Sequence, residues 1–172
     1  MRNLSVRTAT SKDSKIIKDM VNEMYGIEYE KRDLQVIEAA ILSNRELYIL
    51  AYIDSFCVGF AGATLKDNNA ILDYIYVKDD YRGLAVAYEM LMKIVEEIID
   101  AGINSAILQV QTFNKQKFFH YAISDKNIIE TKKCERKNEE YEDQILKIQD
   151  LRKLKDITFK ELMNKVLKYK NE

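Results

Sequence analysis

Residues 70–91 read AILDYIYVKDDYRGLAVAYEML: an apolar run, a polar turn and the start of a long segment with apolar residues at helical spacing. The run Ile71–Val77 predicts a strand, and Lys78–Tyr81 predicts the turn that follows it. Small residues at 82–87 then open a helix whose apolar positions are Val86, Met90, Leu91, Ile94, Val95 and Ile98. The first N–H groups of a helix lack intrahelical acceptors, and the helix dipole favours negative charge there. This stretch therefore predicts a strand–turn–helix unit that holds phosphate.

The composition predicts a single globular domain. The chain has 172 residues, of which 47% are hydrophobic and 32% are charged, and this length suffices for one domain with a proper core. A formal net charge of −1 provides no field that would attract nucleic acid, so we expect no nucleic-acid partner. The sequence has no apolar run long enough to span a membrane, and residues 1–6 are too mixed for a signal peptide. We therefore expect a cytoplasmic protein without membrane contact.

The cysteines and the histidine do not indicate a metal site. Cys57 and Cys134 lie too far apart for metal-ligand spacing, and Cys57 falls in an apolar run, which is typical of a small buried side chain. His120 is the only histidine, which argues against a histidine metal centre and against a Ser-His-Asp triad. We expect no metal cofactor, and reduced thiols fit a cytosolic protein.

The pattern along the chain predicts alternating strands and helices. Gly26 ends the first predicted helix, and Asp54-Ser55 joins two β-rich runs as a hairpin turn. The predicted strands are Leu4–Arg7, Glu46–Ile53, Val58–Leu65, Ala70–Val77, Ser105–Gln111, Ile128–Cys134 and Gln144–Ile148. The further predicted helices open near Asp33, run from the phosphate turn to Ala101, and span Asn114–Ser124 and Thr158–Tyr169. This order predicts an α/β fold with one mixed, mostly antiparallel sheet of six to seven strands, helices on both faces and one right-handed crossover.

The element order and three motifs resemble the GNAT N-acetyltransferase superfamily over residues 4–150. The family's acetyl-CoA motif, Gln/Arg-x-x-Gly-x-Gly/Ala, is similar to residues 82–87, where Arg82 and Ala87 match and Ala85 replaces a glycine. The segment Gly59-Phe60-Ala61-Gly62 resembles the family's Val-Gly-Phe strand. Both motifs stand at the positions in the element order where the family has them.

A third motif follows the fifth predicted strand. The family's Asn-x-x-Ala-x-x-Phe-Tyr segment resembles residues 114–121, in which Asn114 and Tyr121 match while Lys117 and His120 depart. The Gly-Phe pair that commonly follows is replaced by Asp125-Lys126. The order and spacing of the three motifs support the superfamily and no narrower assignment.

The resemblance implies acetyl-CoA as the cosubstrate, held mostly by backbone groups. The backbone of Ile75 and Val77 would pair with the pantetheine arm, and the N–H groups of residues 82–88 would hold the pyrophosphate. The implied cofactor-binding residues are Ile75, Tyr76, Val77, Arg82, Gly83, Leu84, Ala85, Val86, Ala87, Tyr88 and Asn114. Because backbone donors do this work, Ala85 keeps the donor that a glycine would supply. We expect right-handed helical backbone at Ala85, where its methyl group costs little; a positive φ there would lower affinity.

The resemblance also implies direct attack of a neutral amine on the acetyl thioester. A free alkylamine has a pKa of about 10.4 and must lose a proton before it attacks. The Val77 N–H would stabilise the oxyanion, and Tyr121 would protonate the departing thiolate. Tyr121 is therefore the catalytic assignment, with packing in the core as its alternative. The implied function is acetyl transfer to a primary amine of a small molecule or peptide.

The general base is not fixed by the sequence. Ile71 stands where some members of the family carry a glutamate. Asp73, Glu28 and Glu30 are candidates by chemistry alone, and a chain of water molecules is another. Glu28 and Glu30, with Tyr29 between them, favour a cationic acceptor.

A non-catalytic GNAT-like module that binds CoA or a partner protein is the alternative function. The replacement at Ala85, the altered segment 114–121 and the missing base favour it, whereas the presence of Tyr121 argues against it.

The C-terminal part of the chain is predicted to pack on the domain or on a second subunit. Residues 1–150 are predicted as the GNAT-like domain, and 151–172 as a helical extension. Residues 152–172 hold seven Lys/Arg and three Asp/Glu along an apolar stripe. This pattern favours packing on the domain or in a homodimer over binding of an acidic partner or RNA.

Overall fold

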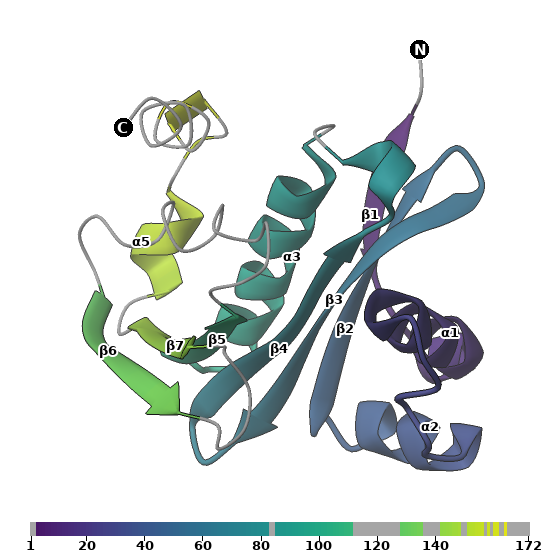
Figure 1. Ribbon diagram of the computed structural model, residues 1–172, viewed down its shortest axis with the longest axis horizontal. Helices are drawn as coiled ribbons and strands as arrows, with labels where there is room; N and C mark the ends of the chain where they lie inside the picture. The colour runs from purple at the N-terminus through teal and green to yellow at the C-terminus, as the bar shows by residue number, and fades with distance from the viewer. Residues whose placement is uncertain are drawn as a thin grey trace.

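The computed structural model describes residues 3–82, 85–111, 128–135, 142–148, 151–156, 158, 160, 161 and 164. Its strands form one sheet of seven in the order β1-β2-β3-β4-β5-β7-β6 (Figure 1). The strands are β1 (Leu4–Thr8), β2 (Glu46–Ile53), β3 (Phe56–Lys66), β4 (Asn69–Val77), β5 (Ala106–Gln111), β6 (Ile128–Glu135) and β7 (Glu142–Ile148). Neighbouring strands are antiparallel except for β4 and β5, which are parallel. The predicted mixed, mostly antiparallel sheet is confirmed.

Helices cover both faces of this sheet, as predicted (Figure 1). Two of them, α1 (Ser14–Tyr25) and α2 (Leu34–Leu42), lie against one face, and α3 (Val86–Asp100) lies against the other. Short 3-10 turns, η1 (Ser11–Asp13) and η2 (Asp79–Tyr81), precede α1 and α3. Gly26 ends α1 with a φ of 68° and its N–H bonded to the carbonyl of Glu23, so the predicted glycine cap is present.

The turns between β2, β3 and β4 follow the predicted hairpins. Asp54 begins the turn of the first hairpin with a φ of 55°. Asp67 and Asn68 both have positive φ, 51° and 60°, which is the backbone of the tight turn that matches the twist of paired strands. Asp and Asn tolerate this conformation better than other non-glycine residues. The meander that carries β4 is therefore fixed by local turn chemistry.

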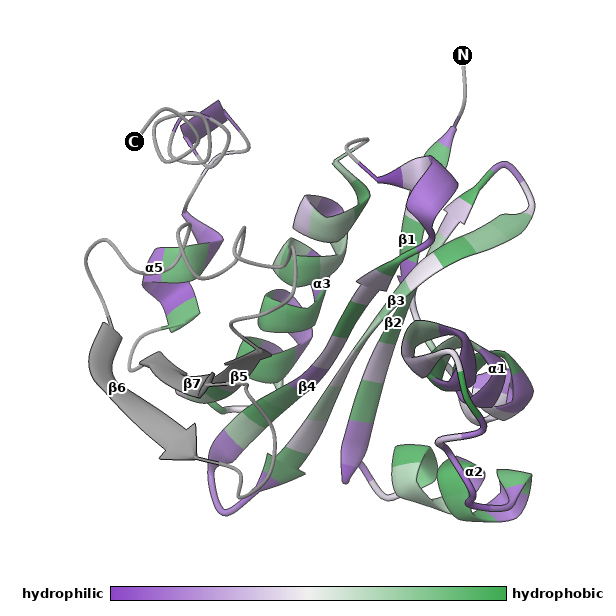
Figure 2. Ribbon diagram, viewed as in Figure 1, coloured by the Kyte–Doolittle hydropathy of each residue, from purple (hydrophilic) through white to green (hydrophobic). Residues whose placement is uncertain are grey.

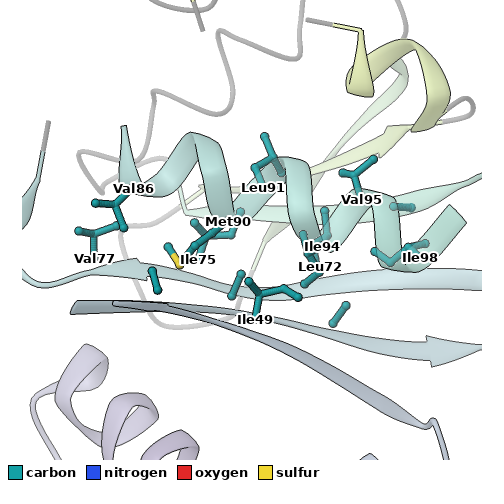
Figure 3. Close-up of a cluster of buried hydrophobic side chains, with 14 of the residues drawn as sticks. Ile49, Leu72, Ile75, Val77, Val86, Met90, Leu91, Ile94, Val95 and Ile98 are labelled. Carbon is teal, nitrogen blue, oxygen red and sulfur yellow. The ribbon is translucent and has the colours of Figure 1, made fainter. Parts of the chain in front are cut away.

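The face of the sheet that carries α3 is a continuous apolar core. Met90, Ile94 and Ile98 point from α3 toward the sheet, where Ile49 and Leu72 lie (Figure 3). Leu91 and Val95 point away from the sheet, toward the C-terminal helix (Figure 3). We call this set of buried residues the α3 core. Figure 2 shows the apolar residues along the central strands and α3.

The opposite face packs α1 and α2 on a second, smaller cluster. Its fully buried members are Ile17, Val21, Ile37, Leu50 and Phe60. Tyr74 and Tyr76 of β4 lie at the border of this cluster and are only partly buried. We call this side of the sheet the α1–α2 face.

The helix α5 (Leu151–Lys155) lies within the predicted helical extension 151–172 and before the predicted amphipathic helix at 158–169. Leu151 and Leu154 are buried in the α3 core. The N–H of Leu151 donates to the carbonyl of Asn104 at 3.1 Å, which ties α5 to the connection after α3. The predicted helix Asn114–Ser124 and most of the helix 158–169 lie outside the described residues. The boundary at residue 150 and the homodimer stay predictions.

Candidate active site

The parallel strands β4 and β5 diverge after a short ladder. Ala70, Ile71 and Leu72 pair with Ala106, Ile107 and Leu108, but β4 continues to Val77 and β5 to Gln111. The two strands separate in the direction of the loop that leads to α3 (Figure 1). The last five residues of β4 therefore run beyond the ladder with β5.

The register with β3 orients the backbone of this part of β4. The N–H of Lys78 donates to the carbonyl of Val58 at 2.9 Å. Hydrogen-bonded and non-bonded pairs alternate in an antiparallel ladder, so Gly59/Val77 and Ala61/Ile75 are non-bonded pairs. The N–H and C=O groups of Ile75 and Val77 consequently point to the edge of β4 that faces β5. Their side chains are buried in the α3 core, so only backbone groups of these two residues lie at that edge.

A β-bulge lies between the part of β4 that pairs with β5 and the last residues of β4. Gly62 of β3 pairs with Tyr74, while the next residue, Ala63, pairs with Leu72, so Asp73 is the extra residue. Leu72 therefore faces α3, whereas Tyr74 and Tyr76 face α1 and α2. Gly62 leaves room for the aromatic rings on that face, since a Cβ there would lie 2.8 Å from the Tyr48 ring and 2.9 Å from the Tyr74 ring. A bulge beside a functional site commonly re-aims a side chain in this way.

Arg82 closes the turn that follows β4. Its Nε donates to the carbonyl of Val77 at 3.1 Å, and its guanidinium forms an ion pair with Asp79 at 2.8 Å. The turn is hydrophilic (Figure 2). This bond ties the start of the turn to the last residue of β4. The described contacts of Arg82 thus hold the turn in shape.

Ala85 has a left-handed backbone, with φ 63° and ψ 7°. The expected right-handed backbone at this position is wrong, and the reason is the path of the chain. Arg82 is still extended, with ψ 146°, and the helix begins at Val86, so the chain turns within three residues. Such a turn needs left-handed backbone, which glycine adopts at low cost and alanine at a cost of about 1 kcal/mol.

The first turn of α3 begins directly after Ala85. The N–H of Glu89 donates to the carbonyl of Ala85 at 3.0 Å, and Ala85, the N-cap residue, provides no side-chain cap. Val86 is 2% exposed and lies in the α3 core, and Ala87 packs against that core. Val86, Ala87 and Tyr88 therefore supply the first-turn N–H groups, while two of their side chains anchor the helix.

Several assigned residues cannot be compared with the structure. Gly83, Leu84, Asn114 and Tyr121 lie outside the described residues, so their roles stay predictions. Among the assigned residues that are described, Ile75, Val77, Arg82 and Ala85 meet around the end of β4 and the start of α3. Tyr76 faces the other side of the sheet, where its hydroxyl lies 3.4 Å from Glu23 Oε1. Its side chain is therefore placed toward α1.

The three carboxylates considered as a base lie in different environments. Glu30 is buried and paired with Arg32 at 2.9 Å, and the hydrogen bond from Arg32 lowers the pKa of Glu30. Asp73 is exposed as a residue, yet neighbouring atoms partly desolvate its carboxyl, which raises its pKa. Thr64 donates to Asp73 Oδ2 at 2.6 Å, and the charge of Glu46 raises the pKa of Asp73 further. Glu28 is exposed, on the connection between α1 and α2.

A partly buried ion-pair network anchors the connection between α1 and α2 to β2. Arg32 pairs with Glu30 at 2.9 Å and with Glu46 at 2.6 Å. The hydroxyl of Tyr48 donates to Glu46 Oε2 at 2.7 Å. The side chain of Asn22 accepts hydrogen bonds from the N–H groups of Tyr29 and Glu30, so the connection is fixed at both ends. Sequence reasoning did not find this network, because its members lie on three separate elements.

Tyrosine side chains form the other feature that sequence reasoning missed. Tyr25 and Tyr29 stack with their ring centroids 3.9 Å apart, and Tyr74 and Tyr76 flank Phe60 at 5.5 and 6.2 Å. The alternation of Tyr74 and Tyr76 on a strand was a signal for a shared face. Only the bulge at Asp73 determines which face that is.

A separate cavity of about 560 Å³ lies at the other end of α3. Its lining includes Glu46, Asp67, Glu97 and Asp100, with Lys66 as a basic member. It adjoins the C-terminal end of α3, which is 15 residues or about 22 Å from the N-terminal end. The cavity is therefore distinct from the region around Val77 and Ala85.

Among the residues that the structure describes, no group of three or more His, Cys, Asp or Glu side chains is arranged to hold a metal ion. None of the described helices is long and apolar enough to cross a membrane.

A model of the acetyltransferase (GNAT) family matches residues 15–120, which is more than half of the chain. The chain therefore belongs to the GNAT acetyltransferase family. The matched region contains β4, the turn after it and all of α3, and it ends one residue before Tyr121.

Similar proteins share the fold with little sequence identity. The structure is similar to the PaiA N-acetyltransferase of Thermoplasma acidophilum in complex with coenzyme A, with a TM-score of 0.62 and 18% identity over 86% of this chain and 99% of that one. It is also similar to YncA, a putative acetyltransferase of Salmonella typhimurium with acetyl-CoA, with a TM-score of 0.67 and 11% identity over 86% and 94% of the two chains. In sequence, the chain is 35% identical over 57 residues to a thialysine N-epsilon-acetyltransferase of Bos taurus. That match covers 33% of this chain and 34% of the bovine protein.

Proposed function

We propose that the protein transfers an acetyl group from acetyl-CoA to a primary amine of a small molecule or peptide. The observation that carries this proposal is the family match over residues 15–120, which includes the strand–turn–helix unit from β4 to α3. Two structures with the same fold are titled as complexes with coenzyme A and with acetyl-CoA. The proposal extends that ligand to this chain.

Backbone groups are the proposed cofactor contacts. Ala85, the N-cap residue, does not cap the first-turn N–H groups of α3 with its side chain, and the positive end of the helix dipole lies there. We assign the pyrophosphate to the N–H groups of residues 82–88 and the pantetheine arm to the edge of β4 at Ile75 and Val77. The left-handed Ala85 supports this assignment, because it turns the chain into the helix beside the predicted phosphate position. Asn114 completes the proposed set.

The proposed reaction is direct attack. The neutral amine nitrogen forms a bond to the thioester carbonyl carbon, the carbon–sulfur bond breaks, and the products are an amide and the thiol of CoA. The N–H of Val77 is assigned to the oxyanion, since the register with β3 points it to the edge of β4 that faces β5. Tyr121 is assigned as the acid that gives a proton to the thiolate.

Asp73 is the carboxylate that we assign as the base. Glu30 is buried in an ion pair that lowers its pKa, which makes it a weaker proton acceptor. Asp73 has a raised pKa and lies in the bulge, four residues before Val77 on the same strand. It would accept the proton of the incoming ammonium, directly or through one water molecule, before the attack.

Acetyl-CoA binding and turnover test the proposal separately. At a hundred times its dissociation constant, acetyl-CoA should stabilise the fold by about 3 kcal/mol, measured as a rise in melting temperature. Release of free CoA in the presence of amines measures turnover. Tyr121→Phe should lower kcat more than it weakens acetyl-CoA binding. Asp73→Asn should lower kcat/KM by about a hundredfold, with a loss of the acidic limb of the pH profile.

A non-catalytic CoA-binding module is the second candidate, and the alanine at the left-handed position 85 is the observation that favours it. It predicts a thermal shift with acetyl-CoA and no CoA release with any amine in a broad panel. Absence of a thermal shift at millimolar acetyl-CoA would exclude both candidates.

A further inference from the structure

The side of α2 that faces solvent is largely apolar and carries no charge. We call its exposed residues, which share one side of the helix, the α2 outer face: Gln35, Val36, Ala39, Leu42 and Ser43. Val36 is 48% exposed and Leu42 is 72% exposed. Ile37 and Ala40 are buried and hold the other side of the helix on the protein. Glu38 is the single charged residue in α2, and it is partly buried.

The neighbouring helix α1 shows how a solvated helix of the same protein differs. Its exposed positions include Lys15, Asp19 and Glu23, and Lys15 pairs with Asp19 at 2.8 Å. A helix that is apolar on all sides is normally buried on all sides. Yet α2 lies at the periphery of the molecule and is mostly apolar (Figures 1 and 2). The α2 outer face therefore has the composition of a surface that a second molecule covers.

The residues of the α2 outer face are arranged symmetrically about Ala39. Val36 and Leu42 stand three positions before and after Ala39, and Asp33 and Arg45 stand six positions before and after it. In a two-fold interface, residue i of one copy contacts residue j of the other, and j contacts i. Two antiparallel α2 helices with Ala39 on the axis therefore place Val36 against Leu42 of the second copy. The small side chain of Ala39 allows the helices to approach closely there.

Opposite charges stand at the two ends of the α2 outer face. Asp33 is the exposed N-cap residue, and its carboxylate makes no capping hydrogen bond. Beyond the other end, Nε of Arg45 donates to Ser43 Oγ at 2.9 Å, which holds the guanidinium beside this face. Among the ion pairs of the described residues, none includes Asp33 or Arg45.

These two charges are too far apart to neutralise each other within one copy. Asp33 and Ser43 are ten residues apart, which corresponds to roughly 15 Å along a helix. This exceeds the Debye length of about 8 Å at physiological ionic strength. In the antiparallel arrangement, Asp33 of each copy lies opposite Arg45 of the other. The charges thus match a second copy of this chain at both ends of the apolar surface.

We propose that α2 forms the interface of a homodimer, in which two α2 outer faces pack antiparallel about a two-fold axis at Ala39. Val36 and Leu42 form its apolar centre, and two pairs between Asp33 and Arg45 form its rim. The interface is separate from the C-terminal extension, because α5 packs on α3, on the opposite face of the sheet (Figure 1). One nine-residue helix from each copy makes a small contact, so we expect a dissociation constant of about 10 μM.

Sedimentation velocity between about 1 μM and about 200 μM protein measures this self-association. Leu42→Asp should raise the dissociation constant about a hundredfold, because the introduced charge enters the interface twice. Phe56→Asp is the matched control, since Phe56 is 69% exposed but pairs with Ile53 at the opposite end of β2 from α2. A monomer at every concentration, or an equal effect of the two substitutions, would overturn the proposal.

A charge exchange identifies the occupant as a second copy. Asp33→Arg and Arg45→Asp should each raise the dissociation constant about tenfold, because each places like charges opposite one another. The variant that carries both substitutions restores opposite charges across the axis, so its dissociation constant should return to within about threefold of the original. A different protein or a lipid surface on α2 would give no such rescue. Additive weakening in the double variant would therefore overturn the proposal.

Disulfide trapping tests the position of the axis. In a protein with Cys57→Ser and Cys134→Ser, Ala39→Cys places one thiol of each copy at the axis. Their Cα atoms would then lie within the range of about 4.4–6.8 Å that a disulfide requires. Oxidised glutathione should convert this variant to a covalent dimer, whereas Lys15→Cys on the exposed side of α1 should stay monomeric. Equal trapping of the two variants would contradict an axis at Ala39, and circular dichroism verifies that each variant is folded.

Discussion

The two faces of the central sheet differ in what they bury. The α3 core consists of apolar side chains such as Ile49, Leu72, Met90 and Ile94 (Figure 3). The α1–α2 face has a smaller apolar cluster, and beside it lie the Glu30–Arg32–Glu46 ion pairs and the partly exposed tyrosines. The same strands thus contribute to a purely apolar layer on one side and to a mixed layer on the other.

This difference indicates a division of labour between the faces. Burial of apolar side chains stabilises the fold independently of pH, and an apolar layer excludes charged groups. We therefore assign a purely structural role to the α3 face. Buried ion pairs add little net stability, but they set the geometry of the groups they connect. We therefore expect substitutions on the α3 face to change stability alone, and substitutions around β4 on the α1–α2 face to change catalysis.

The largest expected effect is on the α3 face. Ile94 is fully buried and points from α3 to the sheet (Figure 3). Ile94→Ala should lower the free energy of unfolding by about 3 kcal/mol, because it removes buried methyl groups and leaves a cavity. Urea unfolding measures this loss. It should be the same at pH 7 and pH 4.5, since no titratable group lies in the α3 core.

The catalytic rate of the folded Ile94→Ala protein provides the contrast. Rates measured well below its melting temperature should match those of the unmodified protein. A large drop in kcat with little loss of stability would contradict the assignment of the α3 face to framework.

The second effect is on the other face, and it depends on pH. Arg7 pairs with the buried Asp13 at 2.8 Å, and this hydrogen bond lowers the pKa of Asp13 to about 2. Because the pKa of Asp13 is lower in the folded than in the unfolded protein, the ionised carboxylate stabilises the fold at pH values above the unfolded-state pKa near 4. This contribution is lost as the pH falls toward 2. Asp13→Asn should therefore cost about 2 kcal/mol at pH 7. The difference in the free energy of unfolding between Asp13→Asn and the unmodified protein should decrease below about pH 4.

Urea unfolding at a series of pH values from 7 to 3 measures this gap. Asp19→Asn is the control, because its exposed pair with Lys15 should contribute less than about 1 kcal/mol at every pH. A constant difference between Asp13→Asn and the unmodified protein across the range would contradict the role of the Arg7 pair.

The sequence predicted the framework better than the mixed face. Periodicity at Met90, Ile94 and Ile98 and the hairpin residues Asp54 and Asp67 are local signals, and the strands and helices they predict are present. The bulge at Asp73 reversed the face of Tyr74, because the addition of one residue to a strand shifts the alternation of side chains. No local sequence pattern predicts such an inserted residue.

Strand–turn–helix order predicted the elements that carry the candidate site, and β4, the turn and α3 are present. The role of Val77 came from the family resemblance and stays a prediction, and the ion pairs beside the site were not predicted. Arg32 contacts Glu46 across 14 positions of sequence, and only the folded chain brings such residues together. The helix α5 falls inside the predicted helical extension, but its bounds were not predicted, because its five residues contain little periodicity and its two leucines are buried by tertiary packing.

A third, smaller effect tests the hydrogen bonding of the mixed face. Tyr48 is buried, and its hydroxyl donates to the carboxylate of Glu46 at 2.7 Å. Tyr48→Phe should lower the free energy of unfolding by about 1.5 kcal/mol, the usual contribution of a hydrogen bond to a charged group. Since Glu46 also raises the pKa of Asp73, the variant should alter the acidic limb of the pH–rate profile as well. Loss of stability with an unchanged pH profile would separate Tyr48 from the proposed base.

The smallest effect is a gain in stability where the α3 core meets the proposed phosphate turn. Ala85 has a φ of 63° and directly precedes Val86, which is held in the α3 core. Glycine adopts this backbone without strain, but it also gives the unfolded chain more freedom, so Ala85→Gly should stabilise the fold by at most about 1 kcal/mol. Thermal unfolding without ligand measures this gain, and the shift with acetyl-CoA measures the effect on the site. If the left-handed turn positions the donors of α3, the glycine variant should bind acetyl-CoA at least as well. A destabilised Ala85→Gly protein would mean that residue 85 is right-handed in solution, and the strain assigned to this turn would then be absent.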